Sequence, residues 1–406
     1  MRWTESTLGQ AVEKGTGLIQ TGPFGSQLHQ SDYLPDGIPV IMPKDIIDGK
    51  VNSQTVARVS EETAHRLQRH RLRPHTIVVP RRGEITKRAF IGTEQEGWLC
   101  GTGCLQIALS GEELVPEYLY YFMEQESVVR WLEQHAVGTT MLNLSGSIIS
   151  SLPLRYPEPK VQRAIADVLW AYDDLIENNR RRMALLQESA RLLYREWFVR
   201  LRFPGHEHTP IVNGLPEGWE RKPLGEVALI NQASLPGNFD GEIEYIDIAS
   251  VAPGEIRETA TYQFRDAPSR ARRIVRHGDV LWSCVRPNRR SFAVVWNPPE
   301  NLIASTGFAV ISPSRVPCAF LYFSTTTDEF VGYLENHARG AAYPAVVAAD
   351  FERAEIIVPS GRLLLAFSEP VEQVLSQIHN LRLQNQKLKA ARDLLLPRLM
   401  SGEITV

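Results

Sequence analysis

The sequence is poor in cysteine and contains no long apolar run. The 406 residues include only Cys100, Cys104, Cys284 and Cys318, too few for the disulfide framework of a small secreted protein. None has partner Cys or His residues at the spacing of a zinc site, so we expect no metal. No segment approaches the ~18 apolar residues that span a bilayer, and the first residues lead into no secretory signal. We therefore expect a cytoplasmic protein without membrane contact.

Catalytic motifs are also missing. No GxxxxGK[ST] motif is present, which excludes an ATP motor, and Gly15-Thr16-Gly17 lacks the third glycine of a dinucleotide site. Asn297-Pro298-Pro299 is similar to the catalytic loop of amino-group DNA methyltransferases, but Glu300 replaces the aromatic residue that stacks on a flipped base. No nucleophile–base pair stands out. The sequence predicts a non-catalytic protein that needs no cofactor.

The overall charge is also low, at −3, and does not by itself indicate a nucleic-acid ligand. With 43% hydrophobic and 22% charged residues the composition is that of a globular protein, which excludes a largely disordered chain. The length fits two or three structural units.

An internal repeat is the strongest feature that is present. A shift of 202 carries Leu119-Tyr120-Tyr121 onto Leu321-Tyr322-Phe323, and Leu132–His135 onto Leu334–His337. Repetition of this kind marks a duplicated structural unit. The chain therefore contains two copies of one unit of about 200 residues.

Each copy has the same predicted order of elements. Short runs of β-forming residues between Gly, Pro or Asp come first, then a short helix, and finally a long helix. The runs predict strands at 38–41, 76–79 and 105–109, and at 245–248, 280–282 and 308–311; the short helices are predicted at 118–134 and 319–336, and the long ones at 160–200 and 363–400. The predicted fold class is α/β (α+β), with two pseudo-symmetric mixed domains.

The long helices carry heptad repeats. In the second copy the a and d positions alternate in steps of three and four from Leu364 to Leu399, and those of the first copy run from Ile165 to Trp197. A 3.5-residue period of this length predicts a coiled coil, antiparallel if the two helices pair within the chain. Asn179 and Asn385 are polar seam residues that either fix the register or are tolerated. We expect Pro370 to start the main second helix.

Positive charge is concentrated at the same place in both copies. Eight Arg or Lys residues lie between His65 and Phe90, opposed only by Glu84, and a second basic block covers 265–290. Such blocks supply phosphate contacts. The turns at 80–83 and 286–290 place Arg and Asn, the residues that read purine edges, on loops that follow strands. Recurrence in both copies favours nucleic-acid binding over a solvated surface.

A duplicated unit with these blocks and helices resembles the specificity (S) subunit of type I restriction-modification enzymes. The resemblance covers the whole chain and is carried by the motifs Gly22-Pro23-Phe24-Gly25-Ser26, Pro157, Gly214–Trp219 and Gly278–Leu281, in this order along the chain, together with the heptads and the duplication. It implies two target recognition domains that each read half of a split site in double-stranded DNA. It also implies that the helices space the domains and dock two methyltransferase (modification) subunits, which restriction (ATP-dependent translocase/nuclease) subunits join.

The resemblance and the repeat together predict five segments. They are a first recognition domain at 1–157, a central helix at 158–202, a linker at 203–218, a second recognition domain at 219–359 and a distal helix at 360–406.

Polar and basic residues of both copies are the candidate DNA contacts. They are Ser26, Lys44, Arg69, Arg71, Arg81, Arg82, Lys87, Arg88, Thr139, Asn143, Arg272, Arg273, Arg286, Asn288, Arg289, Arg290 and Tyr343. The second copy has Ala233–Gly237 in place of the Pro23-Phe24-Gly25-Ser26 stretch, and alanines in place of Thr139, Thr140 and Asn143. We therefore expect the two copies to read different sequences.

Two other hypotheses remain open from the sequence. The chain could be a self-contained DNA methyltransferase or nuclease-related enzyme, against which the missing cofactor loop counts. It could also be a DNA-binding regulator that acts without modification subunits.

Overall fold

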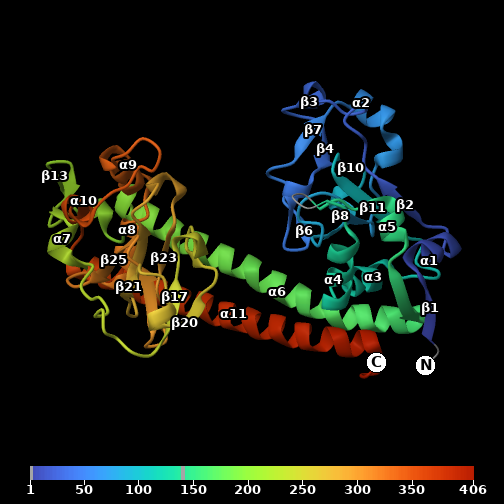
Figure 1. Ribbon diagram of the computed structural model, residues 1–406. Coiled ribbons are helices and arrows are strands. Elements are labelled where there is room, and N and C mark those ends of the chain that lie inside the picture. Colours follow the sequence, from blue (N-terminus) through green and yellow to red (C-terminus); the bar gives the residue numbers. More distant parts are fainter. Residues whose placement is uncertain (1–2, 139–141) are drawn as a thin grey trace. The chain divides into compact units, whose positions relative to one another are not determined.

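The computed structural model describes residues 3–138 and 142–406, and the chain divides into two compact units (Figure 1). Unit 1 comprises residues 1–177 and 386–406, and unit 2 comprises residues 178–385. Each unit mixes short strands with helices, which confirms the α/β (α+β) class. The last segment of the chain therefore folds with the first domain.

Unit 1 contains two four-stranded sheets, ordered β10-β4-β7-β3 and β2-β11-β8-β9, and the pair β1-β12. Its strands are β1 (Trp3–Thr7), β2 (Leu18–Thr21), β3 (Tyr33–Leu34), β4 (Ile38–Ile41), β5 (Ile46–Ile47), β6 (Lys50–Val51), β7 (Ala57–Val59), β8 (Ile77–Pro80), β9 (Ala89–Phe90), β10 (Leu99–Cys100), β11 (Cys104–Ala108) and β12 (Pro153–Pro157). Its helices are α1 (Leu8–Lys14), α2 (Glu61–Arg66), α3 (Pro116–Phe122), α4 (Glu126–His135), α5 (Gly146–Ser150) and the first half of α6 (Pro159–Tyr194).

Unit 2 contains the sheets β16-β25-β22-β23 and β20-β17-β24-β21, and the pair β15-β26. Its strands are β13 (Ile211–Val212), β14 (Leu215–Pro216), β15 (Glu220–Pro223), β16 (Ala228–Ile230), β17 (Glu242–Ile246), β18 (Val251–Ala252), β19 (Glu255–Ile256), β20 (Ala260–Gln263), β21 (Ala271–Ile274), β22 (Val280–Ser283), β23 (Phe292–Val294), β24 (Leu302–Ser305), β25 (Phe308–Pro313) and β26 (Glu355–Val358). Its helices are the end of α6, α7 (Leu224–Val227), α8 (Cys318–Ser324), α9 (Asp328–His337), α10 (Ala348–Arg353) and α11 (Gly361–Ser401) up to residue 385.

The two units share one topology, as the sequence repeat predicts. The sheet β2-β11-β8-β9 of unit 1 has the same strand order as β16-β25-β22-β23 of unit 2. The other sheets share a parallel pair, β10 with β4 and β24 with β17, and differ at their edges. Unit 1 adds β3 beside β7, whereas unit 2 adds β21 beside β24.

The short helix predicted in each copy is in fact two helices. In unit 1 the chain turns between α3 and α4, and in unit 2 between α8 and α9. The hydroxyls of Thr325 and Thr326 bond back to carbonyls of the preceding turn, and that of Thr327 caps α9 by accepting from the N–H of Phe330 at 3.1 Å. Threonine hydroxyls that satisfy backbone groups in this way end one helix and begin the next.

The predicted start of the second long helix at Pro370 is wrong, because α11 already begins at Gly361. A proline inside a helix removes one backbone hydrogen bond. Burial of the preceding turns offsets this loss: Leu364 and Phe367 belong to the core of unit 2, and the Phe367 ring meets those of Tyr194 and Phe198.

The long helices pair in an antiparallel sense. In unit 1 the start of α6, with Ile165 and Leu169, shares a core with Leu399 near the end of α11 (Figure 1). In unit 2 the end of α6 packs on the start of α11. Asn179 Nδ2 donates to Asn385 Oδ1 at 2.9 Å, which favours the register role of these seam residues over the tolerated one.

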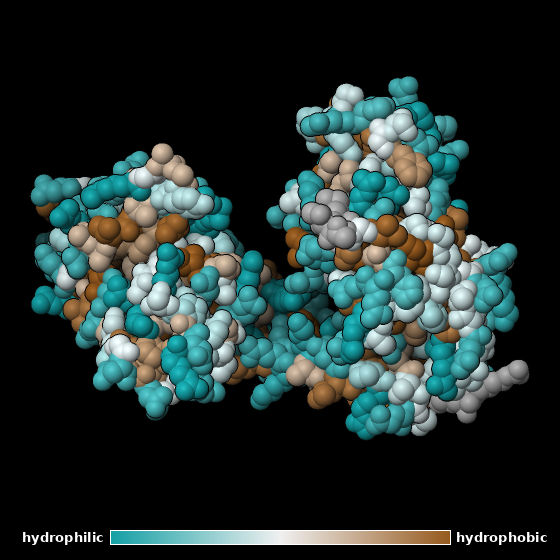
Figure 2. All heavy atoms as spheres, in the orientation of Figure 1, coloured by the Kyte–Doolittle hydropathy of each residue, from teal (hydrophilic) through white to brown (hydrophobic). Residues whose placement is uncertain are grey.

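Apolar side chains of each unit lie mainly in its interior. The core of unit 1 joins β8, β11, α3, α4 and the two long helices, and that of unit 2 joins the corresponding elements. Figure 2 shows mostly hydrophilic residues on the visible face, with apolar ones scattered among them. In the predicted linker, Phe203 is buried against Trp219, with ring centroids 4.9 Å apart, and β13 pairs with β14.

Candidate nucleic-acid interface

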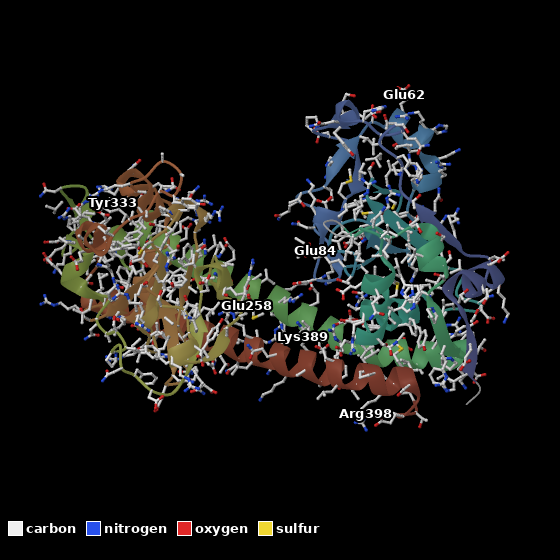
Figure 3. The ribbon with its side chains drawn as sticks, in the orientation of Figure 1. Glu62, Glu84, Glu258, Tyr333, Lys389 and Arg398 are labelled. Atoms are coloured by element: carbon white, nitrogen blue, oxygen red, sulfur yellow. The ribbon has the colours of Figure 1, made fainter. Side chains whose placement is uncertain are left out.

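The loop that follows β8 in unit 1 is fixed by backbone pairing with a second segment. The N–H of Leu144 donates to Arg81 O at 2.8 Å, and that of Gly83 donates to Leu142 O at 3.1 Å. Val137 and Asn143 exchange a further pair of bonds at 3.0 and 2.9 Å. We call residues 81–88, together with 137 and 142–144, the loop platform of unit 1; Glu84 marks it in Figure 3.

Unit 2 repeats this arrangement after β22. The N–H of Val346 donates to Cys284 O at 2.9 Å, and that of Arg286 donates to Pro344 O at 2.7 Å. Arg339 and Ala345 exchange bonds at 2.8 and 2.9 Å. Residues 284–291, with 339 and 344–346, form the loop platform of unit 2. The two loops have equal length, and Arg81, Arg82 and Gly83 correspond to Cys284, Val285 and Arg286.

The platforms present different side chains on this shared backbone. In the loop 81–88 of unit 1 the exposed side chains are Arg82 and Glu84, whereas in the loop 284–291 of unit 2 they are Asn288 and Arg289. A solvent-facing loop on a rigid scaffold is a common position for recognition residues. The same frame can therefore present two different recognition surfaces.

Each platform also holds an arginine against an exposed aromatic ring. In unit 1 the Arg81 Cζ lies 5.2 Å from the centroid of Phe24, which is 52% exposed. Burial, and then the neighbouring Arg82 guanidinium, lower the pKa of Arg81. In unit 2 the Arg286 Cζ lies 4.6 Å from the centroid of Tyr343, which is 69% exposed. Both distances are those of cation–π pairs.

Phe24 lies just after Gly22, where the backbone passes very close to that of Gly101. A Cβ on Gly22 would lie 2.1 Å from the carbonyl oxygen of Gly101, so only glycine fits. Phe24 lies in the motif on which the resemblance rests, but sequence reasoning did not select it as a candidate contact.

Several predicted contacts in the first basic block are engaged inside unit 1. Arg88 donates to Tyr120 O at 2.9 Å and pairs with Glu124 at 2.8 Å, with its side chain only 10% exposed. These contacts engage the Arg88 guanidinium within unit 1. Arg71 pairs with Glu61, and Lys87 with Glu84 at 2.5 Å. The sequence showed only Glu84 as an opposing charge, because Glu61 and Glu124 lie outside the block.

The other predicted contacts occupy varied positions. Ser26, Lys44 and Arg69 are exposed, although Arg69 Nε also donates to His70 Nε2 at 3.0 Å. Asn143 is a platform residue whose Oδ1 is buried and has no partner among the described atoms. Arg272 lies over Phe264, and Arg273 donates to Ser234 Oγ at 3.2 Å. Thr139 lies outside the described residues.

A repeated aromatic–histidine pair ends the helix before each platform. On α4 the rings of Trp131 and His135 stack with centroids 3.9 Å apart, and on α9 those of Tyr333 and His337 stack at 4.1 Å. In each pair the histidine Nδ1 lies 2.8 Å from the backbone carbonyl oxygen of the aromatic residue, and Tyr333 is labelled in Figure 3. The pairs cap the last turns of α4 and α9. Their recurrence at the repeat spacing was a signal in the sequence.

The described residues form neither a metal-binding cluster nor a membrane-spanning helix. Among residues 3–138 and 142–406, no three His, Cys, Asp or Glu side chains gather as they would around a metal ion. All four cysteines are free thiols. Within these ranges no helix has the length and apolarity needed to cross a membrane.

Comparison with known proteins links this geometry to one family. The domain described as type I restriction modification DNA specificity domain matches residues 3–188. The chain is similar to the type I restriction enzyme MjaIX specificity subunit of Methanocaldococcus jannaschii, with 24% identity over 387 residues, 92% of this chain and 88% of that protein. It is also similar to the HindI specificity subunit of Haemophilus influenzae, with 20% identity over 384 residues, 78% of this chain and 83% of that protein.

The fold agrees with that of a solved family structure. The crystal structure of a type I restriction-modification system S subunit from M. genitalium superposes with a TM-score of 0.59 at 17% identity, covering 98% of this chain and 96% of the other. Residues 3–188 therefore match the DNA specificity domain of type I restriction-modification systems, and the chain is similar to specificity subunits of these systems over most of its length.

Proposed function

We propose that unit 1 and unit 2 each read one half of a bipartite target in double-stranded DNA. The repeated loop platform is the observation that supports this proposal. The same backbone pairing recurs in both units, whereas the exposed side chains of the paired loops are Arg82 and Glu84 in one and Asn288 and Arg289 in the other. Two units that share one loop backbone but expose different side chains on it are expected to recognise different half-sites.

Positive charges around each platform supply the sequence-independent part of binding. In unit 1 the exposed cations Lys44 and Arg82 remain after the internal ion pairs are removed. In unit 2, Arg272 and Arg273 are half-buried on β21. Each phosphate that such a cation neutralises releases a counterion, so binding is expected to weaken steeply with salt.

A domain exchange in the assembled complex tests the two-reader proposal. Residues 1–157 are replaced by the corresponding domain of another specificity subunit, and methylation is mapped across the genome with the modification subunit present. We expect one half of the target to change and the other to stay. A change in both halves would contradict independent reading.

The helices α6 and α11 are proposed to set the distance between the half-sites. A heptad inserted in each helix, beside the facing residues Asn179 and Asn385, keeps the seam in phase and adds ~10 Å to the pair. B-DNA rises ~3.4 Å per base pair, so the unread gap is expected to lengthen by about three base pairs. An unchanged gap in a fully active complex would show that the helices do not set the distance between the half-sites.

We also propose that the exposed leucines of the long helices dock two modification subunits, to which restriction subunits then bind. Leu394 in unit 1 is 72% exposed, and Leu185 in unit 2 is 70% exposed. Exposed apolar side chains on a helix surface mark a contact with another protein when they gather. Leu175 in unit 1 and Leu192, Leu365 and Leu383 in unit 2 are further exposed leucines of these helices.

Co-purification tests this docking surface. Leu185→Glu and Leu394→Glu are expected to reduce recovery of the modification subunit, because a charge replaces an apolar contact. Leu229→Glu is the matched control, since Leu229 is an exposed leucine of β16, outside the long helices. Equal recovery with all three variants would contradict the proposal. Tight, specific DNA binding by the chain alone would instead favour an independent regulator.

A further inference from the structure

The loop of unit 2 contains two arginines in a backbone conformation that side chains rarely adopt. Arg286 has φ 52° and ψ 64°, and Arg290 has φ 54° and ψ 38°. Both are left-handed, and they flank the short 3₁₀ turn Pro287–Arg289. The position of Arg286 corresponds to Gly83 of unit 1, which has φ 77°. Glycine adopts this conformation without strain, whereas arginine does not.

The strained conformation is held by contacts at both ends of the turn. Arg286 Nη2 donates to Ala342 O at 3.2 Å, and its guanidinium lies over the ring of Tyr343. Arg290 Nη2 pairs with Asp328 Oδ1, at the start of α9, at 2.5 Å. The Pro287 side chain is buried. Strain that persists because its surroundings fix it is typical of ligand-binding sites.

The residues between these two anchors are left free. Asn288 and Arg289 are exposed, and neither side chain has a hydrogen bond or ion pair within the part of the chain that the structure describes. In unit 1 the corresponding residue to Asn288 is Ile85, which is buried. At these two positions, unit 2 therefore has an unpaired amide and guanidinium where unit 1 has Ile85 and Thr86.

Asn and Arg are the side chains that bind purines with two hydrogen bonds each. Arginine donates to O6 and N7 of guanine, and asparagine pairs with N6 and N7 of adenine. We call Asn288 and Arg289 the tip of this loop. A loop tip that is held in one conformation before binding loses less entropy when it binds. A phosphate contact needs no such fixed geometry, because charge attraction tolerates many orientations.

We propose that Arg289 and Asn288 read a guanine and an adenine in the half-site of unit 2, and that Arg286 and Arg290 are positioning residues for this tip. The proposal rests on the proposed function, since it assigns residues within one of its two readers. It divides the basic loop into two residues that touch bases and two that hold the loop.

Methylation mapping and competition binding with the full chain in its modification complex test the reading residues. Arg289→Ala is expected to lower discrimination at one guanine of one half-site by about 5- to 150-fold, and Asn288→Ala to do the same at one adenine. The other half-site should be unchanged. Arg315→Ala is the control, because Arg315 is an exposed arginine of unit 2 outside both basic blocks.

Two results would overturn the assignment. Uniform weakening on all sequences by Arg289→Ala, with a smaller salt slope, would show a phosphate contact. Unchanged discrimination with both variants would place the readers elsewhere. Failure of the proposed function is distinguishable, because the unmodified chain would then show no bipartite methylation at all.

The positioning role is tested by variants that leave the tip in place. Arg286→Gly removes both the backbone strain and the contacts of the Arg286 side chain with Ala342 and Tyr343. The thermal midpoint of unfolding should therefore not fall. Discrimination should be lost at the same bases as with Asn288→Ala and Arg289→Ala. Tyr343→Ala should act similarly, and Tyr343→Phe, which retains the ring face, should restore discrimination. Retained discrimination in both Arg286→Gly and Tyr343→Ala would overturn the positioning role.

Discussion

Arg392 attaches the end of α11 to unit 1, and its removal should loosen that attachment. Its guanidinium bonds Asp173 on α6, Glu124 at 3.1 Å and Asp393 at 2.8 Å, with the side chain 13% exposed. The three carboxylates raise the pKa of Arg392 against the lowering effect of burial. Arg392→Ala would therefore remove the central cation of a mostly buried network.

The loss of stability in Arg392→Ala depends on which other partners the carboxylates of Glu124 and Asp173 keep. Deleting one partner of a buried pair costs ~3–5 kcal/mol when the other is left alone. Here Glu124 still pairs with Arg88 at 2.8 Å, and Asp173 still accepts from the Tyr121 hydroxyl at 2.7 Å. We therefore expect a smaller loss, about 2–3 kcal/mol, which lowers the melting temperature of a unit of this size by roughly 4–12 °C.

Hydrogen exchange resolved by segment, together with thermal unfolding, measures this loss in unit 1. Arg398→Ala is the matched control (Figure 3), since Arg398 lies on the same helix and pairs with Glu403 at 2.7 Å in an exposed position. An exposed pair contributes ~0–1 kcal/mol. If Arg392→Ala and Arg398→Ala destabilised unit 1 equally, the buried network would not be what holds the end of α11.

Three further predictions follow from buried polar and aromatic groups. Burial, and then the charge of Arg69, lower the pKa of His70 to about 4. Between about pH 6.5 and pH 4 the unfolded chain therefore binds a proton that the folded chain does not, and the stability of unit 1 should fall by up to ~3 kcal/mol over this range. His70→Leu should remove this part of the loss, as measured by denaturant unfolding at several pH values. Trp282→Ala should cost ~3–5 kcal/mol in unit 2 alone by denaturant unfolding, because the side chain is fully buried and donates to Thr325 O at 2.8 Å. Asn385→Leu should cost ~1–3 kcal/mol by leaving the buried Asn179 amide unpaired, whereas Asn179→Leu with Asn385→Leu should recover that loss in the same assay.

Local patterns in the sequence were sufficient to predict the long helices and several strands in the sheets of each unit. The alternating or continuous apolar runs at 38–41, 280–282 and 308–311 coincide with β4, β22 and β25. The heptad positions Leu364, Phe367 and Val371 are buried as the period requires. The strands depend on adjacent and alternate residues and the heptads on residues three or four apart, which is why a single sequence contains both signals.

Features that depend on tertiary contacts were not predictable in the same way. The helix at Pro370 continues because Leu364 and Phe367 are buried in a core that the local sequence does not show. The partner of Arg88 is Glu124, which lies outside the basic block. The loop platforms are formed by segments about sixty residues apart in the sequence, so their pairing could not be read from spacing. A charge count alone therefore could not separate exposed cations such as Arg82 from cations in internal ion pairs such as Arg88.

The left-handed position shared by Gly83 and Arg286 gives a reciprocal test of the common frame. Both residues donate their N–H to the facing segment, with φ 77° and 52°. No atom lies within 4 Å of a Cβ built on Gly83, so Gly83→Ala meets no steric obstacle. It should nevertheless destabilise unit 1 by ~1–2 kcal/mol, because the conformation itself disfavours a side chain. Arg286→Gly should relieve a similar cost in unit 2. Denaturant unfolding of both variants measures the two effects, and a Gly83→Ala variant as stable as the parent would mean that the first loop can abandon this conformation.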